Sequence, residues 1–332
     1  MKRWSAGVHT INSKDELKRV VTTPKGYLMS YFDISGAEVR SCAYLSKDPE
    51  MLKAYNNNLD PYVYAASIIT PGLGDDYYWS IRWLYKIILL GSIYGMGAET
   101  LAAQANIEVE EAETNKNNLF NLFSGLRAYI EHKSTYCIEH GGICETILGD
   151  KMDVSSDPPD RWGRLGINQV IQGFSAVALA CGFENIIKHA RDEKDVNIVP
   201  LLTVHDSSQN YFTSSYIFKL NKFYTKHLTD FLYELVGVLY KFDILIGVNY
   251  YDMVEVGNID DHTLKLKGTY TAITKLLNRL DEDGVKYEIV DMPENFEPDI
   301  TDNIIEAFYL KGRNSSYCDD KSKFKMTIRE VI

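Results

Sequence analysis

The chain has 332 residues, 45% of them hydrophobic, which is enough for two sizeable cores or for one domain with a large insertion. Its five cysteines show no metal-ligand spacing, and no stretch approaches 18 uninterrupted apolar residues, so we predict no disulfide framework, no signal peptide and no membrane span. The net charge of −11 argues against a basic surface over the whole chain, although it leaves room for a local basic groove.

A strand and a long helical region are predicted in the first half of the chain. The strand covers residues 27–33, a β-rich run that ends on the carboxylate of Asp33. A single aspartate at the end of a strand is usually a turn former, so Asp33 alone indicates little. The helical region follows over residues 46–160 and ends in a polar, proline-containing loop over residues 150–160.

One stripe of side chains within the helical region is unusual. Four residues stand at successive i+4 steps, and on a helix they form one slowly drifting row: Arg82, Lys86, Leu90 and Tyr94. The two cations suit a polyphosphate, whereas the apolar group and the ring suit a sugar and a base. A core helix with two solvated cations would show the same spacing. Gly91 and Gly95 weaken that alternative, because a glycine in a helix costs roughly 1 kcal/mol and usually marks a bend or a close approach.

A second aspartate closes a strand in the second half of the chain. Two apolar strands over residues 198–212 meet at His205 and Asp206. Asp33 and Asp206 therefore each end a hydrophobic strand, and they flank the triphosphate-type helix in the sequence. Hard carboxylate oxygens suit Mg²⁺, which keeps waters and phosphate oxygens as its other ligands. The two aspartates together indicate a shared divalent-metal site.

The remaining elements complete an α+β pattern. A long helix over residues 218–240 and a strand over residues 251–257 are predicted, followed by roughly 75 residues with two helical segments (271–280 and 299–310) and a strand-like run (287–290). Strands and helices are segregated around a helical insertion, so the fold class is α+β rather than an alternating βαβ array.

Four stretches carry a resemblance to a known family. Residues 33–40, Asp-Ile-Ser-Gly-Ala-Glu-Val-Arg, resemble motif A of the family A DNA polymerases, the bacterial polymerase I type. Residues 82–95 resemble motif B, the fingers helix that binds the incoming nucleotide, and residues 204–206 resemble motif C. Residues 164–173 are similar to the helix that contacts template and primer in the minor groove. The match runs in order from about residue 3 to residue 257.

The resemblance implies a reaction and its catalytic residues. Deoxynucleotides would be added to a primer 3′-hydroxyl by template-directed, two-metal-ion nucleotidyl transfer in DNA replication. Asp33 and Asp206 would hold two Mg²⁺ ions, and Lys86 would help to protonate the leaving group. The implied substrates and partners are primer–template DNA and deoxynucleoside triphosphates.

The resemblance also implies binding residues. Nucleotide-binding residues would be Arg82, Lys86, Leu90, Tyr94 and Glu38. Glu38 would exclude a 2′-hydroxyl from the sugar site, and Tyr94 would hydrogen-bond Glu38. Contacts to primer and template would come from Arg3, Arg164, Asn168, Gln172 and His205.

A polymerase right-hand architecture is implied, with an antiparallel palm sheet, packed helices and a helical fingers insertion. Residues 1–45 would be the first palm segment, 46–160 the fingers and 161–257 the second palm segment, and 258–332 would be a C-terminal extension of unknown role. The family's thumb and 3′–5′ exonuclease domains precede the segment with which this chain begins, so both are expected to be absent.

Three positions depart from the family pattern. Ser207 stands where motif C usually continues with glutamate, which predicts a reduced rate. Tyr62 replaces a histidine after Asp60, so a phenol is expected in place of one phosphate contact. Leu90 stands where the family normally has phenylalanine or tyrosine.

Two alternatives from other classes stay open. A single-subunit-type RNA polymerase fragment would share the aspartates and the cationic helix, but it needs a small residue at the sugar gate, against which Glu38 argues. A catalytically weak scaffold subunit of a replication complex would be supported by the loss of an aspartate or of Lys86, and both are present.

A partner subunit is also expected. The acidity and the extension favour one half of a split polymerase, such as bacterial viruses (bacteriophages) encode, in the cytoplasm of the host bacterium. A separate protein would then carry the thumb and exonuclease. The extension has apolar positions at helical spacing that can either present a docking face for this protein or simply pack on the palm: Ile273, Leu276, Leu277 and Leu280.

Overall fold

The structure is a computed structural model that describes residues 16–192, 198–204, 207–291 and 324–331. The chain divides into two compact units, which are described one at a time. The sheet unit comprises residues 1–35, 183–228 and 241–332, and the helical unit comprises residues 36–182 and 229–240.

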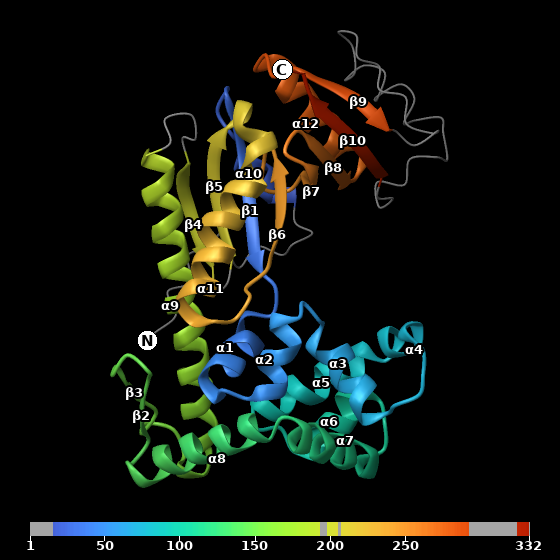
Figure 1. Ribbon diagram of the computed structural model, residues 1–332. Coiled ribbons are helices and arrows are strands. Elements are labelled where there is room, and N and C mark those ends of the chain that lie inside the picture. Colours follow the sequence, from blue (N-terminus) through green and yellow to red (C-terminus); the bar gives the residue numbers. More distant parts are fainter. Residues whose placement is uncertain (1–15, 193–197, 205–206, 292–323, 332) are drawn as a thin grey trace. The chain divides into compact units, whose positions relative to one another are not determined.

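An antiparallel sheet of eight strands organises the sheet unit, in the order β4-β5-β1-β6-β7-β8-β10-β9 (Figure 1). In chain order the strands are β1 (Tyr27–Ile34), β4 (Val199–Val204), β5 (Ser207–Thr213), β6 (Phe242–Gly247), β7 (Met253–Asp260), β8 (Thr263–Gly268), β9 (Tyr287–Asp291) and β10 (Phe324–Glu330). The predicted strand over residues 27–33 is confirmed as β1, and the predicted pair over residues 198–212 is confirmed as β4 and β5. This agrees with the predicted α+β class.

One face of the sheet is apolar and covered by helices. The ring of Phe32 in β1 lies 6.4 Å from Phe183 of α9 (Trp162–Asp192), 5.2 Å from Tyr224 of α10 (Ile217–Tyr224) and 6.3 Å from Phe242, between centroids. Successive side chains of a strand point to opposite faces, so the neighbours Tyr31 and Asp33 belong to the other face. That second face therefore carries Tyr31 and Asp33.

The helix predicted over residues 218–240 is interrupted. The chain forms a short 3₁₀ turn (Ser214–Tyr216), then α10, then a π-helical segment (Thr225–Asp230) and α11 (Phe231–Val236), which ends at Gly237 with a φ of 67°. The π-helical segment shifts the hydrogen-bond pattern by one residue, so the two α-helical stretches do not share one regular periodicity.

The C-terminal extension belongs to the sheet unit. Strands β8, β10 and β9 continue the sheet beyond β7, and α12 (Tyr270–Glu282) contacts β6, β7 and β8. Ile273, Leu276 and Leu280 of α12 are fully buried, so the expectation that this apolar stripe presents a docking face is wrong. The predicted boundary at residue 257 falls inside β7. The helix predicted over residues 299–310 lies outside the described residues.

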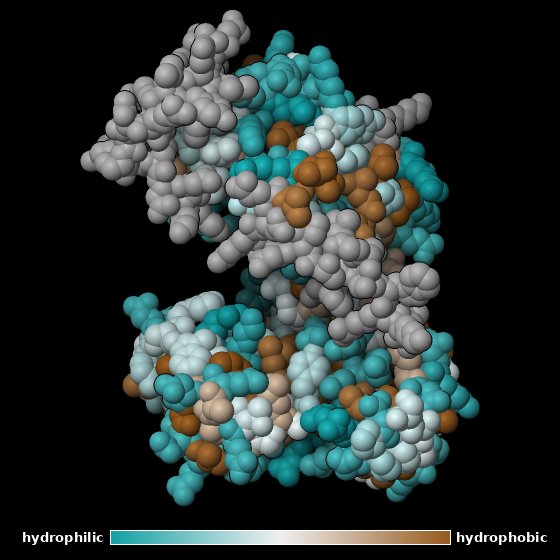
Figure 2. Space-filling view, turned by 180° about the vertical axis from the view of Figure 1, so that it is seen from behind, coloured by the Kyte–Doolittle hydropathy of each residue, from teal (hydrophilic) through white to brown (hydrophobic). Residues whose placement is uncertain are grey.

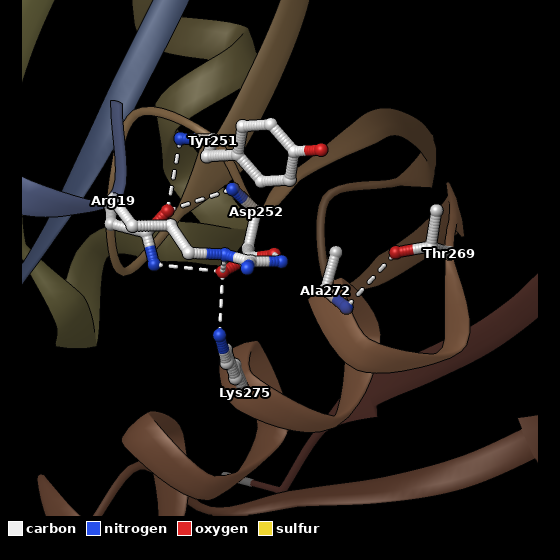
Figure 3. A network of polar contacts seen from close by, with 7 residues as sticks. Arg19, Tyr251, Asp252, Thr269, Ala272 and Lys275 are labelled. Atoms are coloured by element: carbon white, nitrogen blue, oxygen red, sulfur yellow. Dashed lines mark hydrogen bonds and ion pairs between the residues drawn. The ribbon is translucent and has the colours of Figure 1, made fainter. Parts of the chain in front are cut away.

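A polar network ties the extension to the rest of the sheet unit (Figure 3). The buried carboxylate of Asp252 accepts hydrogen bonds from Arg19 in the 3₁₀ turn Glu16–Val20, at 3.2 Å, and from Lys275 of α12, at 2.6 Å. The Asn249 amide donates a third bond at 3.0 Å. Thr269 caps α12 by accepting a bond from the Ala272 N–H at 3.2 Å. Three segments distant in sequence therefore meet at one carboxylate.

The helical unit contains most of the helices. They are α1 (Ala37–Ser46), α2 (Pro49–Asn56), α3 (Pro61–Ile69), α4 (Asp75–Ser80), α5 (Arg82–Ile93), α6 (Ala98–Ala105), α7 (Val109–Leu122), α8 (Ser124–Glu139), α11 and most of α9. A small hairpin of β2 (Ile143–Glu145) and β3 (Lys151–Asp153) precedes a 3₁₀ turn (Pro159–Arg161). Asp48 and Asp60 cap α2 and α3, each followed by a proline at the first helical position. The surface of this unit is mainly hydrophilic in Figure 2, with apolar residues scattered over it.

The division differs from the predicted segments because α9 is a single helix of 31 residues. Its first part, up to residue 182, groups with the helical unit, where Ser175 hydrogen-bonds Ser41 of α1 at 2.7 Å. By length and composition alone, residues 159–192 could cross a membrane. Polar contacts along α9, such as the bond from Asn185 to the carbonyl of His227 at 3.0 Å, are instead typical of a core helix.

Candidate nucleotide and metal site

The stripe on α5 is confirmed as helical up to Ile93, and Tyr94 is its C-cap. Lys86 is exposed, and no hydrogen bond or ion pair joins it to another described residue. Leu90 and Tyr94 are half-buried. The helix therefore presents Lys86 to solvent, whereas Leu90 and Tyr94 are partly covered by the protein.

Arg82 is held by a partner that the sequence analysis did not assign. Its Nε and Nη2 atoms lie 2.8 and 2.7 Å from Oδ2 of Asp60, which also caps α3 through Oδ1. The guanidinium lies 5.0 Å from the ring centroid of Tyr62, which is buried. Burial raises the pKa of the Tyr62 phenol, with Asp60 adding to the effect and Arg82 opposing it. Tyr62 thus lies beside the Arg82 guanidinium, and the expected phosphate contact of its phenol stays a prediction.

Three predicted residues meet at the end of α5. The Tyr94 hydroxyl lies near Glu38, in the first turn of α1, and near Gln172 of α9, and both side chains affect its pKa. Burial raises the pKa of Tyr94, and the Glu38 carboxylate raises it further. Glu38 and Tyr94 are therefore neighbours, and the predicted hydrogen bond between them stays a prediction.

Arg164 packs on the same corner. Gly95, directly after Tyr94, has a φ of 70°, and a Cβ built on it would stand 2.9 Å from Cγ of Arg164. Only glycine leaves room for the Arg164 stem here. One turn further along α9, the Oδ1 atom of Asn168 is buried and has no hydrogen-bond partner among the described residues. The minor-groove residues predicted on α9 are thus adjacent to the end of the nucleotide helix.

Asp33 marks the candidate metal site on the polar face of the sheet unit. The Tyr31 hydroxyl donates a bond to its Oδ2 at 3.3 Å, and Ser207 also bonds Tyr31. Burial raises the pKa of Tyr31 to about 12, the Ser207 bond opposes that rise and the Asp33 charge adds to it. The hydroxyl therefore stays protonated and orients the carboxylate.

The donor chemistry around Asp33 fits a hard divalent cation. Asp33 pairs across the sheet with Ser207 of β5 and with Asp243 of β6, so a carboxylate, a hydroxyl and a second carboxylate stand side by side. Among residues 16–192, 198–204, 207–291 and 324–331, no group of three metal-ligating side chains is present. Arg3, His205 and Asp206 lie outside the described residues, so their predicted roles remain predictions.

Sequence reasoning missed Asp60, Tyr31 and Asp243. Asp60 stands in an Asp-Pro pair typical of a helix start, but its bond to Arg82 spans 22 residues. Asp243 interrupts a strand whose alternate residues Phe242 and Ile244 are apolar, and this alternation does place it on the polar face. That Asp243 lies next to Asp33 follows from the pairing of β1 with β6, and this pairing cannot be predicted from the sequence of either strand alone.

Comparison with known proteins identifies the family. The model of the family "DNA polymerase family A" matches residues 8–252. DNA polymerase I of Chloroflexus aurantiacus is 29% identical over 199 residues, which are 58% of this chain and 21% of that protein. DNA polymerase I of Pseudomonas aeruginosa is 31% identical over 136 residues (41% and 15%), and mouse DNA polymerase theta is 29% identical over 178 residues (51% and 7%). The matched part of the chain thus spans about a fifth or less of these relatives.

A solved structure shows the same fold. It is the POL domain of Pol1 from M. smegmatis, in complex with DNA primer–template and dNTP, with a TM-score of 0.63 and 24% identity over 74% of this chain and 44% of that chain. The family match covers well over half of the 332 residues. The chain belongs to DNA polymerase family A.

Proposed function

We propose that this chain is a template-directed DNA polymerase that adds deoxynucleotides to a primer 3′-hydroxyl. The observation that supports the proposal is the corner at the end of α5, where Glu38 and Gln172 lie near the Tyr94 hydroxyl and Arg164 packs on Gly95. In this proposal Glu38 is the sugar gate, Tyr94 is the base-stacking ring, and Arg164 and Gln172 contact the minor groove.

The reaction divides between the two groups of residues. The primer 3′-oxygen forms a bond to the α-phosphorus of the nucleotide, the bond from that phosphorus to the bridging oxygen breaks, and pyrophosphate leaves. Lys86, exposed and unpaired among the described residues, neutralises the triphosphate and gives a proton to the leaving pyrophosphate. Arg82 binds phosphate with the guanidinium edge that Asp60 leaves accessible, since a third of its side chain is exposed.

Asp33 and Asp206 would hold two Mg²⁺ ions, which promote loss of the 3′-hydroxyl proton and offset charge on the pyrophosphate when bound. Tyr31 orients the Asp33 carboxylate for this role. Glu38 selects the sugar, because a 2′-hydroxyl would clash with its carboxylate, which lies near the Tyr94 hydroxyl.

Primer extension on a template of known sequence tests the proposal. The purified chain should copy the template, and Asp33→Asn should slow extension by several orders of magnitude while primer–template binding is retained, because each 1.36 kcal/mol of lost transition-state stabilisation is about tenfold in rate. Near-normal extension by Asp33→Asn, with the wild-type fold, would remove the proposed metal site.

We propose in addition that a second protein helps to hold the primer duplex, with the chain working as one subunit of a split polymerase in the host cytoplasm. The net charge of −11 supports this, because phosphate neutralisation supplies much of the affinity for DNA. Extension in the presence of a DNA trap, with and without proteins that copurify from the native source, measures the effect. Long products from the 332-residue chain alone would contradict the split-enzyme proposal.

A further inference from the structure

Asp33 has two cross-strand neighbours, and one of them is a second carboxylate. β1 lies between β5 and β6, and Asp33 is the Cα partner of Ser207 on one side and of Asp243 on the other. Directly opposite residues of an antiparallel pair have their side chains on the same face, with Cβ atoms about 4.5–5.5 Å apart. The side chains of Asp33 and Asp243 therefore project side by side from the same face of the sheet.

A bound cation would offset the repulsion between these two carboxylates. Like charges directly opposite each other in a sheet are destabilising. Asp243 is exposed, and no ion pair joins it to any residue that the structure describes.

Asp243 shares a pocket with three lysines. β6 and β7 pair only between residues 245–247 and 253–255, and beyond these pairs a pocket of about 480 Å³ opens. Asp243 lines it together with Lys265, Lys267 and Lys325. Lys267 is already paired with Glu255 at 2.9 Å. The alternative role for Asp243 is therefore general charge balance with the lysines of this pocket.

We infer that Asp243 is a further catalytic residue, whose carboxylate binds the divalent ion held by Asp33 directly or through one water. The inference rests on the proposed polymerase function. It also accounts for Ser207, which provides only a hydroxyl on the β5 side of Asp33, where motif C usually supplies a glutamate. Asp243 of β6 then provides the carboxylate that position 207 of β5 lacks.

The test compares Asp243→Asn with Glu255→Gln. Both variants remove one exposed carboxylate from the same pocket, but Glu255 is the cross-strand partner of Leu245 and has no pairing with Asp33. Binding of Mn²⁺ to the enzyme–primer–template complex is measured from the electron paramagnetic resonance signal of free Mn²⁺, and extension is measured against Mg²⁺ concentration. Asp243→Asn should weaken Mn²⁺ binding and raise the half-maximal Mg²⁺ concentration by about 10- to 100-fold. Glu255→Gln should change neither.

Two further variants sharpen the result. Asp243→Glu keeps the acid and should stay near the wild type. Ser207→Glu in the Asp243→Asn background should bring the half-maximal Mg²⁺ concentration back towards the wild-type value, because residue 207 is the cross-strand neighbour of Asp33 on its other side. Wild-type Mn²⁺ affinity and Mg²⁺ dependence in Asp243→Asn would overturn the inference. Failure of the rescue would overturn the claim that the two acids are interchangeable. If the wild type extends no primer, the proposed function fails, while the Mn²⁺ titration still decides the role of Asp243.

Discussion

At the scale of single residues, Glu38 is the position at which the structure and the proposed chemistry meet most closely. Its carboxylate lies near the hydroxyl of Tyr94, which also lies near Gln172. If Glu38 acts by excluding the 2′-hydroxyl, its removal should change the incorporation of ribonucleotides more than that of deoxynucleotides.

Glu38→Ala should therefore raise the ratio of ribonucleotide to deoxynucleotide incorporation by at least about tenfold, which corresponds to about 1.4 kcal/mol. Single-nucleotide incorporation with each sugar measures the ratio. Glu38→Gln is the matched control, because it keeps the volume of the gate and should keep most of the discrimination. An unchanged ratio in Glu38→Ala would show that Glu38 is not the gate, and would favour the RNA polymerase alternative.

Leu90 leads to a second expectation at this scale. A tyrosine at the matching position of the family offers a hydroxyl that can take the place of the missing 3′-hydroxyl of a dideoxynucleotide, and leucine has no donor. The wild type should resist dideoxy terminators, and Leu90→Tyr should become sensitive. Leu90→Phe adds the ring without the hydroxyl and should remain resistant. Equal sensitivity of the wild type and Leu90→Tyr to dideoxy terminators would mean that residue 90 does not contact the 3′ position of the nucleotide sugar.

At the scale of elements, the connection from α5 to the next helix depends on one glycine. Gly95 has a φ of 70°, and an added Cβ would stand 2.9 Å from Arg164 Cγ and 3.1 Å from its Cδ. Gly95→Ala should lower the free energy of unfolding by about 1–2 kcal/mol through backbone strain and should displace Arg164.

Urea unfolding measures the loss. Gly97→Ala is the matched control, since Gly97 has a φ of −75° and no atom within 4 Å of an added Cβ. A loss as large in Gly97→Ala as in Gly95→Ala would show that general loop rigidity, and not the contact with Arg164, determines the effect.

The carboxylate of Asp252 joins three elements and makes stability depend on pH. Burial alone would raise the pKa of Asp252, but hydrogen bonds from Lys275, Asn249 and Arg19 outweigh it, and the pKa lies below its ordinary value of 3.8. The folded state therefore favours the charged form. This contribution is fully present above the unfolded pKa and is lost as the pH falls through the lower folded pKa.

Asp252→Asn should lower the free energy of unfolding by about 1–2 kcal/mol near neutral pH, given that Arg19 and Lys275 are partly exposed. The difference from the wild type should shrink below about pH 4. Urea unfolding at a series of pH values measures it. A difference that stays constant from neutral pH to pH 3 would show that the charge of Asp252 is not what stabilises this junction.

Local patterns predicted some elements well and others not at all. The strand ending at Asp33, the helix starting at Arg82 and the helix over 271–280 all follow from periodicity within one segment. The extension of the sheet by β8, β10 and β9 does not, because strand order depends on pairing between segments up to tens of residues apart. The apolar stripe of α12 was correctly predicted to be helical. The strands on which it packs could not be predicted from that segment, because they lie elsewhere in the sequence.

The candidate site divides in the same way. Motif spacing was enough to place Glu38, Tyr94 and Gln172 in one site, because the family resemblance supplies the tertiary contacts. The partners specific to this chain could not be read from the sequence: Asp60 on Arg82, Tyr31 on Asp33, and Asp243 across the sheet. Each of these depends on a contact between elements rather than on a motif.

At the scale of the whole molecule, the account is that two groups of residues serve one templated reaction. The helical unit holds the residues proposed to select and bind a nucleotide, and the sheet unit holds Asp33 with Ser207 and Asp243 as its cross-strand neighbours. A template-reading enzyme must choose the nucleotide by shape, and in this proposal Arg164 and Gln172 contact minor-groove acceptors shared by correct base pairs.

Single-turnover incorporation of one nucleotide by the 332-residue protein tests this claim most directly. The rate is measured for each of the four deoxynucleotides opposite each of the four template bases, with excess enzyme and Mg²⁺. The complementary nucleotide should be incorporated at least about a hundredfold faster than any other, equivalent to about 2.7 kcal/mol of discrimination. Equal rates for all four nucleotides, or no incorporation of any, would contradict the account.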